Sequence, residues 1–412
     1  MAEIIDQYDD VIVYSEEGHP TPFYEYNGQI AANPYGVLQV LLDDDDLEEV
    51  MYNGGKQCVK IAHRKHGMCR TNIWVEDEEG IQIAKNIASH TEVPLGDGPG
   101  MVPIFDGRLP DGSRVNGTIP PVSPDGPTLT IRKFREDPIT IVDLIKWGTV
   151  SPRLAAMFWT WVDGLGAKPA NFVIAGGTGS GKTTTLNCLG MFVPWSDRVL
   201  SVEDTAELQI YHDHWLRMET RDRRPDGTSE IDMNDCLKSS LRMRPDRVIV
   251  GEVRGPEAAT MLMAMNTGHD GSFGSLHANT ANETVKRLVN PPMSVPAIML
   301  NALDLIIMQA RLNVGGKNIR RITEVAEIAG MEGDTPRLNP IWKYDASQGK
   351  IVETGVPSKV REIICTAKGC TPADFEAVVR QKEQILTDLV NRDIRDIESV
   401  TRIIQTYHST VN

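Results

Sequence analysis

The sequence predicts an α/β protein with a small α/β N-terminal domain, a larger doubly wound domain with a mainly parallel sheet, and a helical C-terminal tail. From Ser151 onward, short apolar segments bounded by glycine or charge alternate with longer segments of helical periodicity. A glycine-rich loop lies between one of these apolar segments and a helix. The proline- and glycine-rich stretch Pro94–Pro127 comes before this region and indicates a different organisation.

The N-terminal domain is predicted over residues 1–136. Up to about Ala88, short apolar runs alternate with polar turns, and Pro94–Pro127 indicates loops between short strands. Thr128–Phe134 alternates apolar and polar residues, which predicts a strand. We expect the acidic run Asp43–Glu49 to be the solvated start of a helix.

Residues 137–150 are predicted to form a helix-bearing linker to the larger domain, which we place at residues 151–345. Three short apolar segments of that domain predict buried parallel strands: Asn171–Ala175, Val199–Val202 and Val248–Val250. Because strands of this kind alternate with helices, we expect a doubly wound sheet with helices on both faces.

The C-terminal segment, residues 346–412, is predicted to be helical. Thr371 and Pro372 are typical of a helix cap and first turn, and Asp374 follows in that turn. Apolar residues at helical spacing then predict a face that packs on the larger domain. These are Phe375, Val378, Val379, Leu386, Leu389 and Val390.

The composition of the chain indicates which classes of partner it can bind and in which compartment it is expected. Its 412 residues carry a formal net charge of −15, so we expect repulsion from a phosphate backbone and no nucleic-acid partner. The first ten residues lack the apolar core of a signal peptide, and no segment approaches the roughly 20 apolar residues of a spanning helix. The six cysteines show no C-x-x-C spacing. We expect a cytoplasmic protein with reduced thiols.

The glycine-rich loop Gly176–Thr183 fits the pattern G-x-x-x-x-G-K-[ST] and is flanked by a predicted strand and a predicted helix. Its glycines let successive N–H groups surround phosphate oxygens, and the helix N-terminus adds its positive end. We expect Lys182 to contact the β- and γ-phosphates of ATP and the Thr183 hydroxyl to coordinate Mg²⁺. The predicted ATP-binding residues are Gly177, Thr178, Gly179, Ser180, Gly181, Lys182, Thr183 and Thr184.

Candidate catalytic residues follow the neighbouring predicted strands. Glu203 and Asp204 come directly after the second strand and Glu252 ends the third, so a parallel sheet brings them to the edge that carries the loop. We expect Glu252 to polarise the attacking water, and Glu203 or Asp204 to orient water around the metal. Gly251 stands where many P-loop ATPases carry Asp, so we expect Glu203 and Glu252 to contact Mg²⁺ through water. His277 ends a further apolar run and is placed to sense the γ-phosphate.

Four motifs together resemble the secretion ATPase superfamily, which includes the motors of type II and type IV secretion, type IV and Tad pili, and the archaellum. They are the Walker A loop Gly176–Thr183, the acidic box Ser201–Glu207, the atypical Walker B segment Leu241–Pro256 and the histidine box Thr267–Asn279. Segments elsewhere are similar to the archaeal branch, which contains archaellum motor ATPases of the FlaI type and type IV pilus ATPases of the GspE type. These segments are Leu109–Arg114, Thr130–Pro138 and Asn290–Pro296.

The resemblance implies a RecA-like P-loop ATPase domain flexibly joined to the N-terminal domain, a homo-hexameric ring, and a place at the inner face of the cell membrane. The implied partner is a polytopic membrane platform protein of a pilus or archaellum machine. Arg114, Arg132 and Arg135 match arginines that approach the phosphates in this family. Positive charge there would stabilise the transferred phosphoryl group. Further candidates for phosphate or neighbouring-subunit contacts are Arg242, Arg244 and Arg254.

Three functions remain open from the sequence. The first is a motor that couples ATP hydrolysis to the assembly or movement of a pilus-like filament or archaellum. The second is a RecA-like nucleic-acid motor, which the acidic charge and the lack of an aromatic and basic stretch oppose. The third is a nucleotide-regulated module without turnover, which Glu252, Glu203 and His277 oppose.

Overall fold

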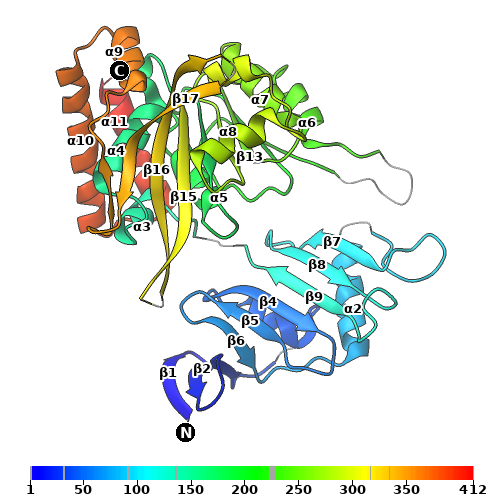
Figure 1. Ribbon diagram of the computed structural model, residues 1–412. Helices are drawn as coiled ribbons and strands as arrows, with labels where there is room; N and C mark the ends of the chain where they lie inside the picture. The colour runs from blue at the N-terminus through cyan, green and yellow to red at the C-terminus, as the bar shows by residue number, and fades with distance from the viewer. Residues whose placement is uncertain are drawn as a thin grey trace. The chain divides into compact units, whose positions relative to one another are not determined.

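The computed structural model describes residues 2–30, 33–90, 93–134, 137–221, 229–315, 317–333 and 335–411. The chain divides into two compact units, a first unit over residues 2–134 and a second unit that begins at residue 137 (Figure 1). Both units combine strands with helices, as the predicted α/β class requires.

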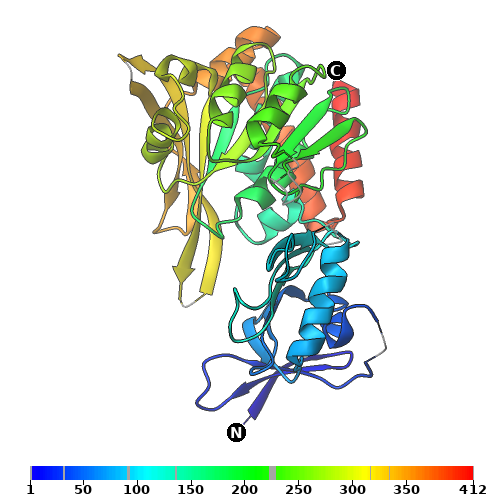
Figure 2. The ribbon, with the colours of Figure 1, turned by 90° about the vertical axis from the view of Figure 1, so that its right-hand side faces the viewer.

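The first unit is built on a sheet with the strand order β1-β2-β3-β6-β5-β4-β9-β8-β7 among its described residues. Helix α2 packs on one face of this sheet (Figure 2), where Ile83, Ala84 and Ile87 are buried in the core of the unit. The pairs are antiparallel except β3 with β6. The strands are β1 Ala2–Tyr8, β2 Val11–Glu16, β3 Phe23–Tyr26, β4 Leu47–Asn53, β5 Lys60–His63, β6 Gly67–Thr71, β7 Ile104–Arg108, β8 Arg114–Thr118 and β9 Thr128–Arg132; the helices are η1 Gly36–Leu38, α1 Gln39–Leu42 and α2 Asp77–Ser89.

The acidic run Asp43–Glu49 does not begin a helix, so that prediction was wrong. Helix α1 ends before the run, and β4 begins inside it at Leu47. Leu47 and Val50 are buried in the sheet core, and this contact fixes the segment as a strand. Asp44, in the turn before β4, accepts a hydrogen bond from the Tyr24 hydroxyl at 2.6 Å.

The second unit contains a sheet with the order β12-β11-β13-β14-β10-β15-β16-β17-β18 in the described part of the chain. The strands from β12 to β15 are parallel, and β15 to β18 form antiparallel pairs. Predicted strands are confirmed as β10 Phe172–Ala175, β11 Val199–Glu203 and β13 Arg247–Val253. The other strands are β12 Trp215–Glu219, β14 Phe273–Leu276, β15 Leu305–Val314, β16 Lys317–Glu332, β17 Thr335–Asp345 and β18 Lys350–Glu353.

Helices cover both faces of this sheet, which gives the doubly wound architecture that the sequence predicts (Figures 1 and 2). Phe172 and Ile174 of β10 face one layer of helices, and Val173 and Ala175 face the other. The first layer holds α3 Ile141–Lys146, α4 Pro152–Asp163, α5 Lys182–Gly190, α9 Lys359–Lys368, α10 Pro372–Asn391 and α11 Ile397–Val411; the second holds α6 Met233–Ser240, α7 Glu257–Asn266 and α8 Ala281–Val289. Short 3₁₀ turns are η2 Gly164–Gly166 and η3 Ala297–Ala302.

The predicted linker, residues 137–150, and the C-terminal segment, residues 346–412, also belong to the second unit. Residues 137–150 carry α3, which buries Ile141, Val142 and Leu144 in this core. The segment predicted to be helical begins with a strand, β18. Ile351 of β18 pairs with β17 and is buried there, which holds this part of the chain in the sheet. The predicted cap of α10 is confirmed, with Asp374 N donating to Thr371 Oγ1 at 3.2 Å, and Thr371 and Asp374 together form a capping box.

Among the described residues, no helix combines the length and the apolar composition that crossing a bilayer requires. All six cysteines are free thiols.

Candidate active site

The glycine-rich loop connects β10 to α5 at the carboxyl end of the parallel strands. Gly179 has a φ of +70° and Gly181 a φ of +93°, a left-handed conformation that favours glycine. A Cβ at Gly176 would lie 2.1 Å from the carbonyl oxygen of Gln309, so β15 leaves no room for a side chain there. The loop therefore has the conformation and close packing that a phosphate cradle needs.

Lys182 begins α5 and is buried against the loop. Its Nζ donates hydrogen bonds to the carbonyl oxygens of Gly176 at 3.0 Å and Gly177 at 3.2 Å. Burial lowers the pKa of Lys182, and the charge of Glu252 opposes this shift. Because a phosphate oxygen would compensate the desolvated ammonium, the geometry fits the predicted contact with ATP.

Thr183 and Thr184 lie in the first turn of α5, both half-buried, next to the positive end of the helix. Ser180 Oγ donates to the Gly177 carbonyl at 2.8 Å and closes the loop. Within the described ranges, no group of three or more His, Cys, Asp or Glu side chains is placed to hold a metal ion. A Mg²⁺ ion bound at this loop would take the Thr183 hydroxyl, phosphate oxygens and water as ligands.

Glu252 lies near the end of β13, where two neighbours contact its carboxylate. Oε2 accepts a hydrogen bond from Arg254 NH2 at 2.7 Å, and His277 Nε2 lies 2.9 Å from Oε1. The His277 contact is not a hydrogen bond of good geometry, so Oε1 has no hydrogen-bond donor among the described residues. Burial would raise the pKa of Glu252, but the hydrogen bond and charge of Arg254, with His277 and Lys182, lower it. The lowered pKa favours the ionised carboxylate, and one of its oxygens is buried without a hydrogen-bond donor among the described residues.

Arg254 joins two of the predicted catalytic acids. Its NH1 lies 3.1 Å from Asp204 Oδ2, while its NH2 contacts Glu252. His277 follows β14, and burial together with the charge of Lys182 lowers its pKa, which favours the neutral imidazole. The second unit therefore brings Glu252, His277 and Asp204 together at one edge of the sheet.

Glu203, at the end of β11, is 2% exposed and differs from the other acids. Its Oε2 accepts hydrogen bonds from the backbone N–H groups of Glu207 at 2.7 Å and Leu208 at 2.9 Å. Its Oε1 is buried and has no hydrogen-bond partner within the described residues. Burial raises the pKa of Glu203 to about 6, against the two backbone hydrogen bonds. Glu203 thus holds the acidic box in shape and leaves one oxygen for a further ligand.

The structure also explains Gly251. A Cβ at this position would lie 2.9 Å from Glu203 Cγ, closer than side-chain carbons normally approach. The side chain of Glu203 therefore occupies the space that an aspartate at position 251 would need.

The predicted arginines of the N-terminal domain lie in the first unit. Arg114 of β8 and Arg132 of β9 are cross-strand partners, and Glu49 of β4 is the partner of Arg132 on its other side. Both arginines are exposed. Arg135 lies outside the described residues.

Sequence reasoning missed three polar residues beside the loop: Gln309, Arg311 and Arg320. Arg320 Nε donates a hydrogen bond to the Gly179 carbonyl at 3.1 Å. One pattern in the sequence could have identified two of them. Gln309 and Arg311 follow the apolar part of β15 at alternate positions, which places both side chains on one face of the strand.

A family model described as "Type II/IV secretion system protein" matches residues 54–371. The chain belongs to this family. It is 32% identical to the protein MJ0781 of Methanocaldococcus jannaschii, over 90% of this chain and 75% of that protein. It is 33% identical to the conjugal transfer protein TrbB of Rhizobium radiobacter, over 71% of this chain and 87% of that protein.

Among solved structures of this secretion family, the ATPase DotB of Yersinia pseudotuberculosis shares the fold. The TM-score is 0.50 at 15% identity, over 95% of this chain and all of that chain. The predicted membership in the secretion ATPase superfamily and the predicted fold class are both confirmed.

Proposed function

We propose that this member of the type II/IV secretion family binds Mg·ATP on the loop Gly176–Thr183 and hydrolyses it to drive a pilus-like filament or archaellum through a membrane platform protein. The observation that carries the hydrolytic part is the buried oxygen of the Glu252 carboxylate that lacks a hydrogen-bond donor among the described residues, next to His277 and at the edge that holds Lys182. Its position matches that of a general base for the attacking water.

Each residue of the site has a role in this proposal. Lys182 binds the β- and γ-phosphates and Thr183 holds Mg²⁺, which neutralises phosphate charge when bound. Glu252 accepts the proton of the attacking water, and neutral His277 donates a hydrogen bond to the γ-phosphate. Glu203 and Asp204 orient water around the metal. Arginines of the first unit stabilise the charge that develops on the phosphoryl group: Arg114, Arg132 and Arg135.

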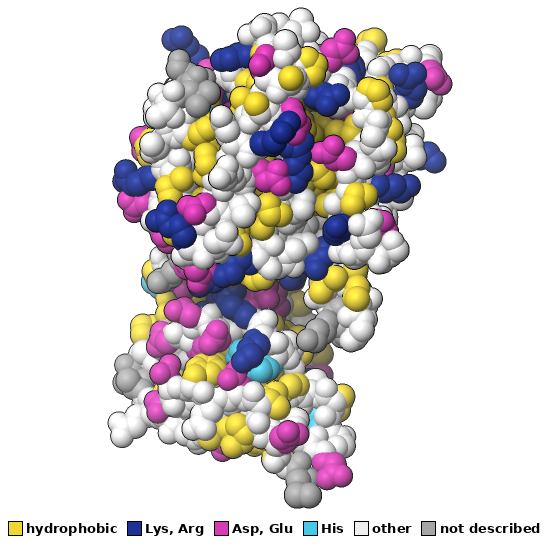
Figure 3. Space-filling view, turned by 90° about the vertical axis from the view of Figure 1, so that its left-hand side faces the viewer, with side chains coloured by type: hydrophobic (Ala, Val, Ile, Leu, Met, Phe, Trp, Pro, Cys, Tyr) yellow, Lys and Arg dark blue, Asp and Glu magenta, His cyan; other side chains and the backbone are white. Residues whose placement is uncertain are grey.

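The motor part of the proposal rests on the family and on the character of the surface. We place the protein in a homo-hexameric ring on the cytoplasmic face of the membrane. On the face of the second unit that carries the C-terminal helices, basic and acidic side chains are mixed and no large area of one sign is visible (Figure 3). With a net charge of −15, this supports a protein partner over a nucleic acid.

The proposal is tested by ATP hydrolysis and solution mass, with and without Mg·ATP, for the wild type and the Glu252→Gln variant. We expect Mg-dependent turnover by the wild type, at least about 100-fold slower turnover by the variant, and similar ATP affinity in both, because only the proton acceptor is lost. Glu398→Gln, in an exposed pair with Arg402, is the matched control and should keep full turnover. Undiminished turnover by Glu252→Gln would refute the assignment.

A further inference from the structure

The β15–β16 hairpin places two arginines beside the phosphate-binding loop. Arg311 of β15 and Arg320 of β16 are direct cross-strand partners. Arg320 Nε donates to the Gly179 carbonyl at 3.1 Å, and its Cδ lies 3.1 Å from a Cβ built on Gly181. Arg311 NH1 lies 3.7 Å from a Cβ built on Gly179. Both guanidinium groups therefore lie against the glycines of the loop.

The charges of this pair are not balanced by the protein. Like charges directly opposite each other on antiparallel strands destabilise the pairing. No carboxylate forms an ion pair with Arg311 or Arg320 in the part of the chain that the structure describes. The carbonyl of Gly179 is a neutral acceptor. An anion held between the two side chains would remove their repulsion and gain charge-assisted hydrogen bonds.

A third polar group lies on the same side of the loop. Gln309 precedes Arg311 by two residues and shares its face of β15, and its side chain is 2% exposed. Its Nε2 lies 3.1 Å from a Cβ built on Gly181. Its Oε1 is buried and has no hydrogen-bond donor among the described residues, which is costly unless a ligand supplies one.

The order of the strands shows which part of a nucleotide would meet these groups. Strand β10, which leads into the loop, lies between β14 and β15. Glu252 and His277 lie on the β13–β14 side, where the γ-phosphate is proposed to bind. The hairpin lies on the opposite side. Because the loop amides hold the α- and β-phosphates, the part of the nucleotide nearest the hairpin is the α-phosphate and the nucleoside.

From this geometry we propose that Arg320, together with Arg311, binds the α-phosphate of the nucleotide, with Gln309 as a neighbouring acceptor for the nucleoside. The proposal rests on the proposed nucleotide site but not on hydrolysis. The arginines add a contact with the α-phosphate to those that the loop makes with the β-phosphate. They contribute to binding rather than to the chemical step.

The test measures the dissociation constants of ADP and of inorganic phosphate, the latter by competition against labelled ADP, for the full-length protein and its Arg320→Gln variant. Inorganic phosphate can occupy the β-phosphate position of the loop but has no second phosphoryl group at the α-position. We expect Arg320→Gln to weaken ADP binding about tenfold, as loss of one charge-assisted hydrogen bond implies, and to change phosphate binding less than about twofold. Arg311→Gln should act in the same direction.

Arg321→Gln is the matched control. Arg321 is the next residue of β16, but its NH1 donates to the Trp147 carbonyl at 2.8 Å, away from the loop. It should leave both constants unchanged. The melting temperature of ligand-free Arg311→Gln should not fall, because this change removes a repulsion.

Equal weakening of ADP and inorganic phosphate would show that Arg320 only shapes the loop, and unchanged ADP binding would show that it contacts no nucleotide. Either result overturns the proposal. A protein that binds ADP through Arg320 but does not hydrolyse ATP would sustain this inference while refuting the proposed ATPase activity, so the two failures are distinguishable.

Discussion

At the scale of single residues, Gly251 and Glu203 depend on each other. The Glu203 side chain crosses the position that a Cβ on Gly251 would occupy, and two backbone hydrogen bonds hold its carboxylate in place. The missing Walker B aspartate and the buried acid of the neighbouring strand are therefore two aspects of one packing arrangement.

Gly251→Ala tests this arrangement. The new methyl group must displace Glu203 or the end of β13, so we expect turnover to fall at least about tenfold and stability to fall by about 1–3 kcal/mol. The measurements are ATP hydrolysis and urea unfolding followed by tryptophan fluorescence. In a double-mutant cycle with Glu203→Ala, the double variant should lose less stability than the sum of the single variants. Additive losses would show that the two residues do not interfere.

The pKa of Glu203 gives a second residue-scale prediction. The folded protein keeps the Glu203 proton up to about pH 6, whereas an unfolded glutamic acid loses it near the ordinary value of 4.5. The protonated Glu203 side chain makes its full contribution to the free energy of unfolding below about pH 4.5. This contribution is lost as the pH rises to about 6. Relative to Glu203→Gln, the free energy of unfolding of the ligand-free wild type should fall by about 2 kcal/mol across this window.

The measurement is urea unfolding at several pH values. Tryptophan fluorescence is suitable because six of the seven tryptophans lie after residue 137, in the second unit. Asp304, whose pKa burial also raises to about 6, is present in both proteins, so its contribution cancels. A wild-type and variant pair with parallel pH profiles would contradict the buried, raised pKa of Glu203.

At the residue scale, the sequence predicted the residues of the candidate site whose type is required by the chemistry of phosphate binding. The loop pattern identified Lys182, and the strand ends identified Glu252 and His277, which the structure brings together. Their catalytic roles stay predictions. Arg320 was not predictable, because its contact with Gly179 depends on the register of a hairpin more than 100 residues away. Packing between distant segments leaves no local pattern.

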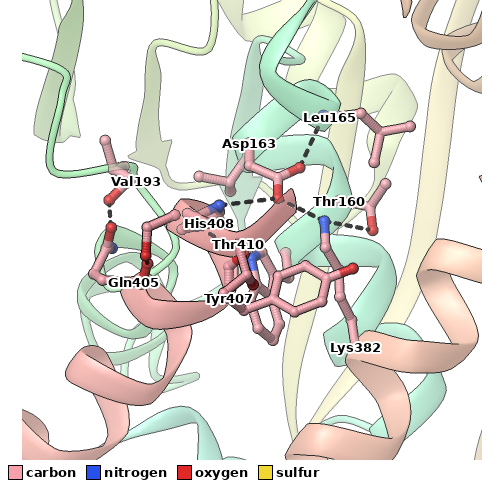
Figure 4. Close-up of polar contacts among 12 residues, drawn as sticks. Thr160, Asp163, Leu165, Val193, Lys382, Gln405, Tyr407, His408 and Thr410 are labelled. Carbon is pink, nitrogen blue, oxygen red and sulfur yellow. Dashed lines mark hydrogen bonds and ion pairs between the residues drawn. The ribbon is translucent and has the colours of Figure 1, made fainter. Parts of the chain in front are cut away.

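At the scale of elements, α10 is fixed to α4 by a buried ion pair (Figure 4). Lys382 Nζ donates to Asp163 Oδ2 at 2.5 Å and to Thr160 Oγ1 at 3.3 Å. His408 of α11 places its Nδ1 3.6 Å from the same carboxylate oxygen, and its Nε2 accepts a hydrogen bond from Trp159 at 3.3 Å. One carboxylate at the end of α4 thus contacts two helices of the C-terminal segment.

Lys382→Met should destabilise the second unit by about 3–5 kcal/mol, because Asp163 would remain buried without its cation. Urea unfolding by tryptophan fluorescence measures this loss. Adding Asp163→Asn to the variant should restore part of the stability. Arg380→Met on the same helix is the control, since its exposed pair with Glu376 should contribute less than about 1 kcal/mol. A loss no larger than that of the control would contradict the anchoring role.

The sequence predicted α10 well because its signals are local. Thr371 is the predicted cap of this helix, and Phe375, Val379 and Leu386 of the predicted apolar face are buried. The burial of Lys382 could not be predicted, since a lysine at helical spacing ordinarily marks a solvated face. The start of β4 was mispredicted for a related reason: Leu47 becomes a strand residue through its neighbours in the sheet.

At the scale of the whole molecule, the chain consists of two units with separate hydrophobic cores. The second unit holds the loop and the acids of the proposed site, and the first unit holds Arg114 and Arg132. In the proposed function Arg114 and Arg132 stabilise the transition state, so turnover depends on residues of both units.

This requirement gives the last prediction, Arg132→Gln. We expect turnover to fall at least about tenfold while ATP affinity changes less than about threefold, because the arginine acts on charge that develops during phosphoryl transfer. Lys85→Gln, an exposed cation of α2 in the same unit, is the control and should leave turnover unchanged. Arg114→Gln should resemble Arg132→Gln.

Mixing then shows whether the arginine acts within one subunit or between two. Arg132→Gln keeps an intact loop, and Glu252→Gln keeps intact arginines. If an arginine of one copy serves the nucleotide of its neighbour, mixed rings contain complete sites and recover turnover that neither variant has alone. If it serves its own copy, the mixture stays at the level of the two variants. Unchanged kinetics in both Arg114→Gln and Arg132→Gln would leave these arginines as surface charges of β8 and β9, and the second unit would have to carry out hydrolysis alone.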